Sequence, residues 1–354
     1  MLAPSRILRT TPARAGGGRD RDDLVDQAED MIAEGSRSFA TASRLFPEAV
    51  REQCWLLYAW CRRCDDLADD QELGGALGPE EGADRRIRSI RLLTERAFEG
   101  LPTADPAFDA IGLLAREVGI TPDMTDDVIQ GFELDADGWR PRTEADLARY
   151  CYHVAGAVGV MMAIVMGVSK DDSDTLDRAC DLGFAFQLAN IARDLKEDDA
   201  ADRCYLPVEW MVEQDIEPGQ LLKPHHRQEL AELAKRLIDR MDQHLAMARL
   251  GAAKLPFRSR WAVLAAARIY GAIGHKVVAR GIHAWDSRTT IPGFEKLRHV
   301  AAAWWEALRN KPDPVETPPE WNRGDILIDV RMRGPIPDPP MEPLPEEEPS
   351  DRYD

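Results

Sequence analysis

The sequence has little cysteine, no long hydrophobic run and no apolar leader, and each shortage excludes a class of protein. Six cysteines in 354 residues show no disulfide-framework spacing, which excludes a disulfide-stapled fold and fits a reducing cytosol. The longest uncharged apolar run, residues 154–168, is too short to span a bilayer of about 30 Å and predicts a buried helix. The first twenty residues lack the apolar core of a secretory signal. We therefore expect a cytoplasmic protein.

Positive charge is also scarce, because the formal net charge is −18 at pH 7. A nucleic-acid backbone would be repelled by the protein as a whole, so nucleic acid is not an expected partner. Clustered carboxylates can instead collect divalent cations, and these would let an acidic protein bind an anionic substrate. The acidic clusters are therefore the first place to look for a site.

Most of the chain carries apolar residues at helical spacing, with glycine and proline clusters between the segments. No sustained period-two alternation is present, so the expected fold class is all-α, as one large helical bundle. The predicted helices cover residues 22–35, 48–71, 83–99, 105–118, 122–136, 144–167, 172–199, 225–253, 258–285 and 292–309.

Both ends of the chain differ from the helical body, which we place at residues 22–310. Residues 1–21 are rich in arginine and contain a glycine run, which predicts a disordered basic arm. Residues 311–354 hold eleven of the 24 prolines and a surplus of acids, which predicts a disordered, solvated tail.

The first acidic cluster continues a strongly apolar helical segment. Asp65 and Asp69 lie one turn apart on the same helical face, which Tyr58 and Arg62 share. Like charges at this spacing repel each other. Their presence is explained if they hold a divalent cation, which prefers hard oxygen ligands.

The second cluster places Asn190, Asp194 and Asp198 in one stripe along a helix. The segment before it, residues 182–191, is almost wholly apolar, so the stripe should begin inside the protein. Each cluster alone is equally compatible with a solvated helix face, but the pair, with adjacent Arg62 and Arg193, favours a metal site. Facing stripes could hold Mg²⁺ ions that bind and neutralise a diphosphate leaving group.

With these two motifs the sequence resembles the squalene/phytoene synthase family from about Gly35 to about Leu297. Residues 58–69 are similar to the first aspartate motif of that family, and residues 187–198 to the second. The resemblance implies four catalytic acids, which are Asp65, Asp69, Asp194 and Asp198. It implies as ligands of Mg²⁺, which Mn²⁺ can replace, Asp65, Asp69, Asn190, Asp194 and Asp198.

Further motifs imply the substrate contacts. Residues 35–39 resemble the family segment that contacts a diphosphate, and residues 150–159 resemble the lining of its isoprenoid tunnel. Residues 203–207 resemble the signature after the second motif, although Asp202 stands where a glycine is commoner, so that loop is expected to differ. The implied substrate-binding residues are Ser36, Arg37, Ser38, Tyr58, Arg62, Tyr150, Val154, Gln187, Arg193 and Tyr270.

Two features stay open on the residues alone. Gly156 and Gly159 remove side-chain volume from one helix face, which either allows close helix packing or leaves room for a ligand. Phe186 lies on the buried helix before the second cluster, where core packing is favoured over a place in the site.

The resemblance implies an isoprenoid synthase-type bundle around a central apolar cavity. The implied activity is that of a prenyltransferase, which condenses two geranylgeranyl diphosphates head to head. The reaction passes through a cyclopropyl (prephytoene) diphosphate to phytoene, as the first committed step of carotenoid biosynthesis. No dinucleotide-binding fingerprint is present, so NADPH is not expected. The alternatives are a dehydrosqualene or squalene synthase acting on two farnesyl diphosphates, and a catalytically silent homologue.

The implied product is a long hydrocarbon, which indicates peripheral contact with the inner membrane. The acidic net charge does not favour that contact, so we expect an exposed apolar patch to provide it. A downstream phytoene desaturase is the further partner that the resemblance suggests.

Overall fold

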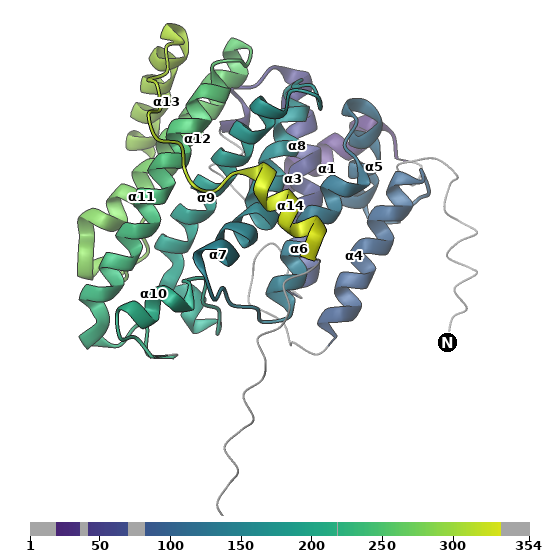
Figure 1. Cartoon of the computed structure of the whole chain (residues 1–354). Helices are drawn as coiled ribbons and strands as arrows, with labels where there is room; N and C mark the ends of the chain where they lie inside the picture. Colours follow the sequence, from purple (N-terminus) through teal and green to yellow (C-terminus); the bar gives the residue numbers. More distant parts are fainter. Residues whose placement is uncertain (1–18, 36–41, 70–81, 218, 334–354) are drawn as a thin grey trace, which may run out of the picture.

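The computed structural model describes residues 19–35, 42–69, 82–217 and 219–333, and within these ranges it contains helices and no strand (Figure 1). The all-α prediction is confirmed. The α-helices are α1 (Arg21–Gly35), α3 (Glu48–Ala68), α4 (Ala83–Phe98), α5 (Pro106–Val118), α6 (Pro122–Ala136), α7 (Glu144–Cys151), α8 (Ala157–Val165), α9 (Ser173–Ala200), α10 (Val208–Glu213), α11 (Arg227–Ala252), α12 (Phe257–Arg280), α13 (Gly293–Arg309) and α14 (Arg323–Arg333).

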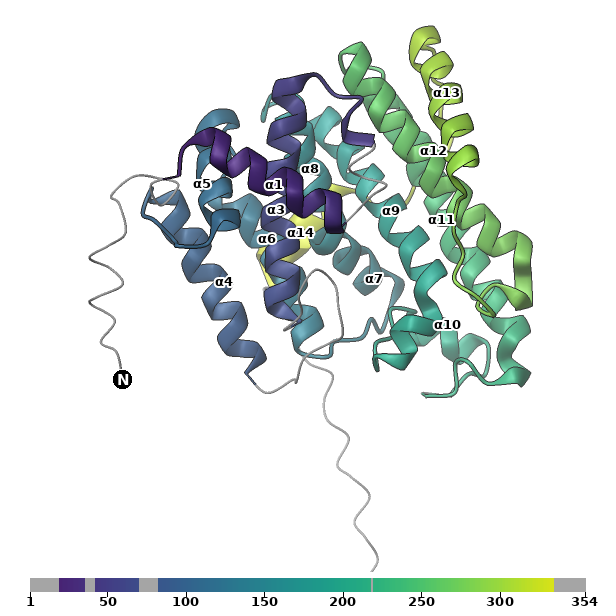
Figure 2. The ribbon, with the colours of Figure 1, turned by 180° about the vertical axis from the view of Figure 1, so that it is seen from behind.

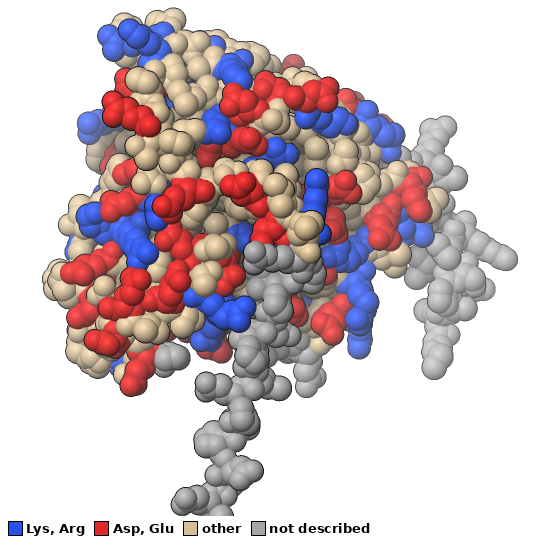
Figure 3. Space-filling view, in the orientation of Figure 1, with Lys and Arg blue, Asp and Glu red and all other residues tan. Residues whose placement is uncertain are grey.

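The long helix α9 is the central element, and α8, α11 and α12 all pack against it. Helix α13 packs on α12 and forms an outer edge of the bundle (Figures 1 and 2). On the other side, α3 packs against α1, α4 and α5. Acidic and basic side chains are interspersed over the face drawn in Figure 3, so the net negative charge is not gathered there in one patch.

Local signals explain where α9 begins and why it is central. The Asp172 carboxylate accepts a hydrogen bond from the Thr175 backbone N–H at 3.1 Å, which caps the first turn. The middle of the helix is apolar on several faces, so it can be covered by several partners at once. One continuous helix thus carries the second acidic cluster in line with its buried part.

The predicted helix 144–167 is observed, but it ends at Val165 and contains one π-helical turn, η2 (Tyr152–Gly156). Thr143 and Asp146 form a capping box that fixes its start. A π turn inserts one extra residue into the helical ladder and is frequent at functional sites. Here it lies between α7 and α8.

Two helical stretches have the length and composition of a membrane span. In residues 144–165, 72% of the apolar window is buried inside the bundle, which confirms the expected buried helix as far as Val165. In residues 257–283 the buried share is 39%. Both stretches pack against α9, but most of the second window is not buried inside the bundle.

Gly159 packs closely against α9 and also lines an apolar cavity, so both alternatives left open for the glycines apply to it. A Cβ atom on Gly159 would lie 2.4 Å from the carbonyl oxygen of Ala179, and one on Gly183 would lie 2.3 Å from that of Ala155. Both distances are far below van der Waals contact. The glycines are therefore required where the two backbones approach.

The C-terminal prediction is wrong for residues 311–333. Trp321 is buried, helix α14 begins at Arg323, and the Arg323 guanidinium donates to the Asp177 carboxylate on α9 at 2.9 Å. Ile326 and Val330 of α14 are buried as well. These apolar residues stand inside a proline-rich stretch whose average composition conceals them. Residues 334–354 lie outside the described residues.

The folded body also begins slightly earlier than predicted. Arg21 forms ion pairs with Glu52 at 2.6 Å and Glu117 at 2.7 Å, and Arg19 pairs with Asp109 at 3.3 Å. The assignment of the arm to residues 1–21 is therefore too long at its C-terminal end. Residues 1–18 lie outside the described residues.

Candidate active site

Carboxylates from three helices line one polar cavity. The end of α3 contributes Asp65, α6 contributes Asp135, and α9 contributes Asp194 and Asp198 together with the Asn190 amide. The two acidic clusters read from the sequence thus face the same space. Asp135 is an additional acid that the sequence motifs did not indicate.

Burial and mutual repulsion oppose ionisation of these acids. Burial, together with the negative charges of Asp194 and Asp135, raises the pKa of the Asp198 carboxyl to about 7. Burial outweighs the opposing effect of the neighbouring Arg62 cation, so the pKa of Asp65 is raised to about 6. Burial also raises the pKa of Asp135 to about 6. The cavity therefore holds more negative charge than its surroundings compensate, and a cation would relieve it.

Arginines hold both acids of the first cluster. Arg62 pairs with Asp65 at 3.0 Å, and Arg203, from the loop after α9, pairs with Asp69 at 2.6 Å. The residue before Arg203, Asp202, has a left-handed φ of 54°, which glycine adopts more readily. Asp202 therefore adopts a backbone conformation that favours glycine, and the expected difference of this loop from the family stays a prediction.

Two arginines converge on Asp194 in the second cluster. The Arg193 Nε donates to Asp194 Oδ1 at 2.7 Å, and the Arg288 guanidinium lies 3.0 Å from the same oxygen. Arg288 follows α12 in the chain and reaches α9 from a separate element. Arg193 and Arg203 line the polar cavity, and Arg62 and Arg288 pair with carboxylates that line it. All four guanidinium groups could donate hydrogen bonds to an anionic substrate instead.

The oxygen donors suit Mg²⁺ in kind, since it prefers carboxylate and amide oxygens. Among the described residues, however, no three His, Cys, Asp or Glu side chains are already gathered into a metal site. The reason is visible in the ion pairs, because arginines occupy Asp65, Asp69 and Asp194. The residues fit a divalent cation once those arginines release the carboxylates.

An apolar cavity of about 300 Å³ adjoins the polar one. Val154, Gln187 and Asn190 line both cavities and so mark their junction. Phe186 and Tyr270 stack in the apolar cavity with ring centroids 4.0 Å apart. Phe186, which the sequence assigned to the core, therefore faces this cavity instead, because helix packing leaves that side of α9 open.

Tyr150 forms part of the wall of the polar cavity. Its hydroxyl donates to Asp135 at 3.0 Å, and its ring stacks on Tyr205 with centroids 4.7 Å apart. The Tyr205 hydroxyl donates to the same carboxylate at 2.8 Å. Asp135 shares the apolar face of α6 with Val128 and Phe132, and an acid on such a face is a signal that could have revealed it.

The remaining predicted substrate contacts are placed only in part. Arg62 and Tyr58 lie on α3 ahead of Asp65, and a Cβ atom on Gly35 would lie 2.6 Å from the Tyr58 hydroxyl. Arg193 lines the polar cavity beside Gln187. Ser36, Arg37 and Ser38 lie outside the described residues.

The chain is similar to known proteins over most of its length. A family model described as Squalene/phytoene synthase matches residues 32–295. A phytoene synthase of Pseudescherichia vulneris is 46% identical over 304 residues, which cover 85% of this chain and 98% of the relative. A 15-cis-phytoene synthase of Pantoea ananas is 42% identical, with 81% and 93% covered.

Solved structures of similar proteins share the fold of this chain. A dehydrosqualene synthase crystallised with a ligand superposes with a TM-score of 0.73 at 25% sequence identity, covering 82% of this chain and 98% of that one. A squalene synthase from Alicyclobacillus acidocaldarius superposes with a TM-score of 0.65 at 19% identity and shows the same fold. The expected isoprenoid synthase-type bundle is confirmed. The chain belongs to the squalene/phytoene synthase family.

Proposed function

We propose that the protein is a prenyltransferase that condenses two geranylgeranyl diphosphates head to head, through a cyclopropyl (prephytoene) diphosphate, to phytoene. This is the first committed step of carotenoid biosynthesis. The observation that carries the proposal is the junction of the two cavities at Val154, Gln187 and Asn190. An isoprenoid diphosphate has the same two halves, an anionic head and a hydrocarbon tail. The relatives named phytoene synthases, at 46% and 42% identity, support the longer substrate.

The residues of the polar cavity would bind and release the diphosphate. Mg²⁺ or Mn²⁺, held by Asp65, Asp69, Asn190, Asp194 and Asp198, would neutralise the leaving diphosphate. Arg193, Arg203 and Arg288 now pair with Asp194 and Asp69. If those carboxylates held a divalent cation, the three guanidinium groups could donate to the diphosphate oxygens instead, so each positive charge would keep an anionic partner.

The apolar cavity would protect the allylic cation that forms when the diphosphate leaves. Its lining is mostly aliphatic, so water has few hydrogen-bonding partners there. The stacked rings of Phe186 and Tyr270 offer π faces, which attract positive charge. The protein's part in this step is therefore shielding and electrostatic stabilisation. NADPH has no role in the proposed reaction.

The decisive test is the product. Purified protein is incubated with Mg²⁺ and either farnesyl or geranylgeranyl diphosphate, with and without NADPH, and the extracted hydrocarbon is analysed by mass. We expect a C40 triene from geranylgeranyl diphosphate without NADPH, and no product after chelation of the metal. A C30 product would move the assignment to dehydrosqualene or squalene synthase. No product from either substrate would favour a catalytically silent homologue.

We also propose that α13 provides the peripheral membrane contact. One face of this helix exposes an apolar stripe at helical spacing, composed of Phe294, Leu297, Trp304, Trp305 and Leu308. Tryptophan and leucine on one helix face are typical of helices that lie in a membrane interface. The helix forms an outer edge of the bundle, where a flat surface could reach it (Figure 2).

The charges of α13 favour an anionic lipid surface despite the acidic protein. Its acids are paired within the bundle, since Glu295 binds Lys276 at 2.9 Å and Glu306 binds Arg268 at 2.6 Å. Arg298 and Arg309 are exposed beside the stripe. The outward charge of this helix is therefore positive. A C40 product could leave through the same lipid towards the desaturase that consumes it.

Vesicle flotation tests this contact. Wild-type protein is expected to float with vesicles that contain anionic lipid, and the double variant W304S/W305S to bind them about tenfold more weakly, because it loses two apolar anchors. Val212→Ser, at an exposed apolar residue on α10, is the matched control and should float normally. Wild-type protein that fails to float at any salt concentration would contradict the proposal.

A further inference from the structure

Arg178 is the one charged side chain that lines the apolar cavity among the residues that the structure describes. It lies at the end remote from the polar cavity. The cavity lining on α9 runs from Asn190 at the polar junction to Thr175, and along η2 and α8 it runs from Val154 to Met166 at the end of α8. Arg178 is about 18 Å along α9 from Asn190, given the helical rise per residue. A hydrocarbon that enters from the junction therefore meets a cation at the far end.

The stem of Arg178 is packed against α11. A Cβ atom on Gly251 would lie 2.3 Å from the Arg178 Cβ, so α11 can approach only because this residue is glycine. Ala252 and Leu255 line the same end of the cavity. The side chain therefore has little room to move towards α11.

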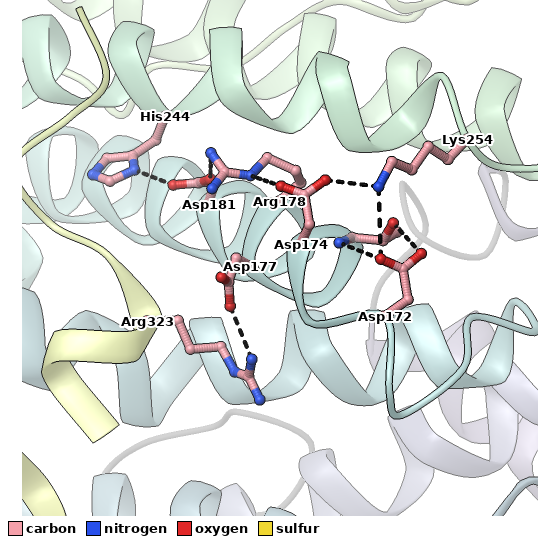
Figure 4. Close-up of polar contacts among 9 residues, drawn as sticks. Asp172, Asp174, Asp177, Arg178, Asp181, His244, Lys254 and Arg323 are labelled. Atoms are coloured by element: carbon pink, nitrogen blue, oxygen red, sulfur yellow. Dashed lines mark hydrogen bonds and ion pairs between the residues drawn. The ribbon is translucent and has the colours of Figure 1, made fainter. Parts of the chain in front are cut away.

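A buried pair of residues fixes the guanidinium. Arg178 Nη1 lies 3.0 Å from Asp181 Oδ2, and the other oxygen of Asp181 lies 2.7 Å from His244 Nδ1 (Figure 4). The Asp181 side chain is 5% exposed and that of His244 is fully buried. Trp321, from the C-terminal segment, packs against the imidazole with ring centroids 5.5 Å apart. The carboxylate that holds Arg178 is thus itself immobilised.

We propose that Arg178 is the residue that limits the length of the prenyl chain, so that a geranylgeranyl chain is accepted and a chain one isoprene unit longer is rejected. This inference rests on the proposed function and names the residue that sets its specificity for chain length. A further unit would press hydrocarbon against the guanidinium and remove its water without offering a hydrogen bond, which is costly for a charged group. The ion pair with Asp181 prevents the cation from turning away.

The test compares chain lengths in binding and in turnover. Non-hydrolysable diphosphates with C15, C20 and C25 tails are titrated into wild-type protein and Arg178→Leu, and kcat/KM is measured for the C20 and C25 substrates. Arg178→Leu is expected to raise the C25-to-C20 ratio about tenfold in both measurements, since it adds apolar depth and removes the charge. Arg178→Lys, which retains a cation, should keep the wild-type ratio.

Lys254→Leu is the matched control, because Lys254 pairs with Asp174 near the same end of α9 but does not line the cavity (Figure 4). It should leave the ratio unchanged. If Arg178→Leu does not fold, Arg178→Met, which retains more of the side-chain length, is measured in the same way. An unchanged ratio in the folded variant would overturn the inference. Wild-type protein that binds the C20 analogue but forms no C40 product would reject the proposed function alone, and the binding series would still test Arg178.

Discussion

Asp194→Asn is expected to lower the rate of phytoene formation on the order of 10³-fold while leaving the fold intact. Asp194 lies in the polar cavity and pairs with Arg193 at 2.7 Å and Arg288 at 3.0 Å. Asparagine keeps the size of the side chain and one acceptor oxygen, so helix α9 should stay in place. The amide removes the negative charge that would bind a divalent cation. It also leaves the positive charges of the two guanidinium groups without this anionic partner.

The measurement is the initial rate with geranylgeranyl diphosphate at several Mg²⁺ concentrations, together with the thermal midpoint of the variant. Asp239→Asn on α11 is the matched control, because its carboxylate pairs with Lys235 at 2.5 Å, is 59% exposed and lines neither cavity. That variant should retain the wild-type rate to within about twofold, because exposed ion pairs contribute little. Equal rates for the two variants would show that the polar cavity is not the reaction site.

Local signals account for the parts of the fold that the sequence predicted. Helix α9 was expected at residues 172–199 and is observed at Ser173–Ala200, since its cap and its apolar core segment are both encoded within the helix. The spacing of Asp65 and Asp69 likewise fixes their common face without any tertiary information. Where the relative positions of side chains depend on one helix, they can be predicted from the sequence of that helix alone.

The contacts between helices could not be read in this way. Arg203 reaches Asp69 at 2.6 Å from a loop far along the chain, and Asp135 receives the Tyr205 hydroxyl at 2.8 Å. No local pattern links these partners, since their meeting depends on how α3, α6 and α9 pack. The sequence therefore predicted acids for a metal site, but it did not predict that arginines pair with several of these acids.

The C-terminal segment shows a different cause of error. Proline and acid content, averaged over residues 311–354, outweighed the few apolar residues that dock. Trp321 packs on His244, and Arg323 pairs with Asp177 at 2.9 Å, so one aromatic ring and one cation anchor the segment. A short docked helix needs few buried residues when the surface that receives it is already folded.

Gly183→Ala is expected to lower the free energy of unfolding by about 2 kcal/mol, because overpacking costs more than alanine returns in helix propensity. The new Cβ would lie 2.3 Å from the Ala155 carbonyl oxygen and 2.7 Å from the Gly156 Cα. Both contacts involve backbone atoms, which cannot turn aside as a side chain can. The π turn η2 and helix α9 would have to separate, and Gly183 also lines the apolar cavity.

Thermal unfolding of the variant should show a fall of about 4 °C or more, given the usual relation between stability and midpoint for a domain of this size. Gly293→Ala on α13 is the matched control, because a Cβ there would meet no atom within 4 Å. The control should be neutral or slightly stabilising, since alanine restricts the unfolded chain. Equal midpoints for the two variants would mean that α8 and α9 do not approach as closely as the glycines allow. A loss of midpoint confined to Gly183→Ala would show that the close approach at Gly183, which lines the hydrocarbon cavity, stabilises the fold.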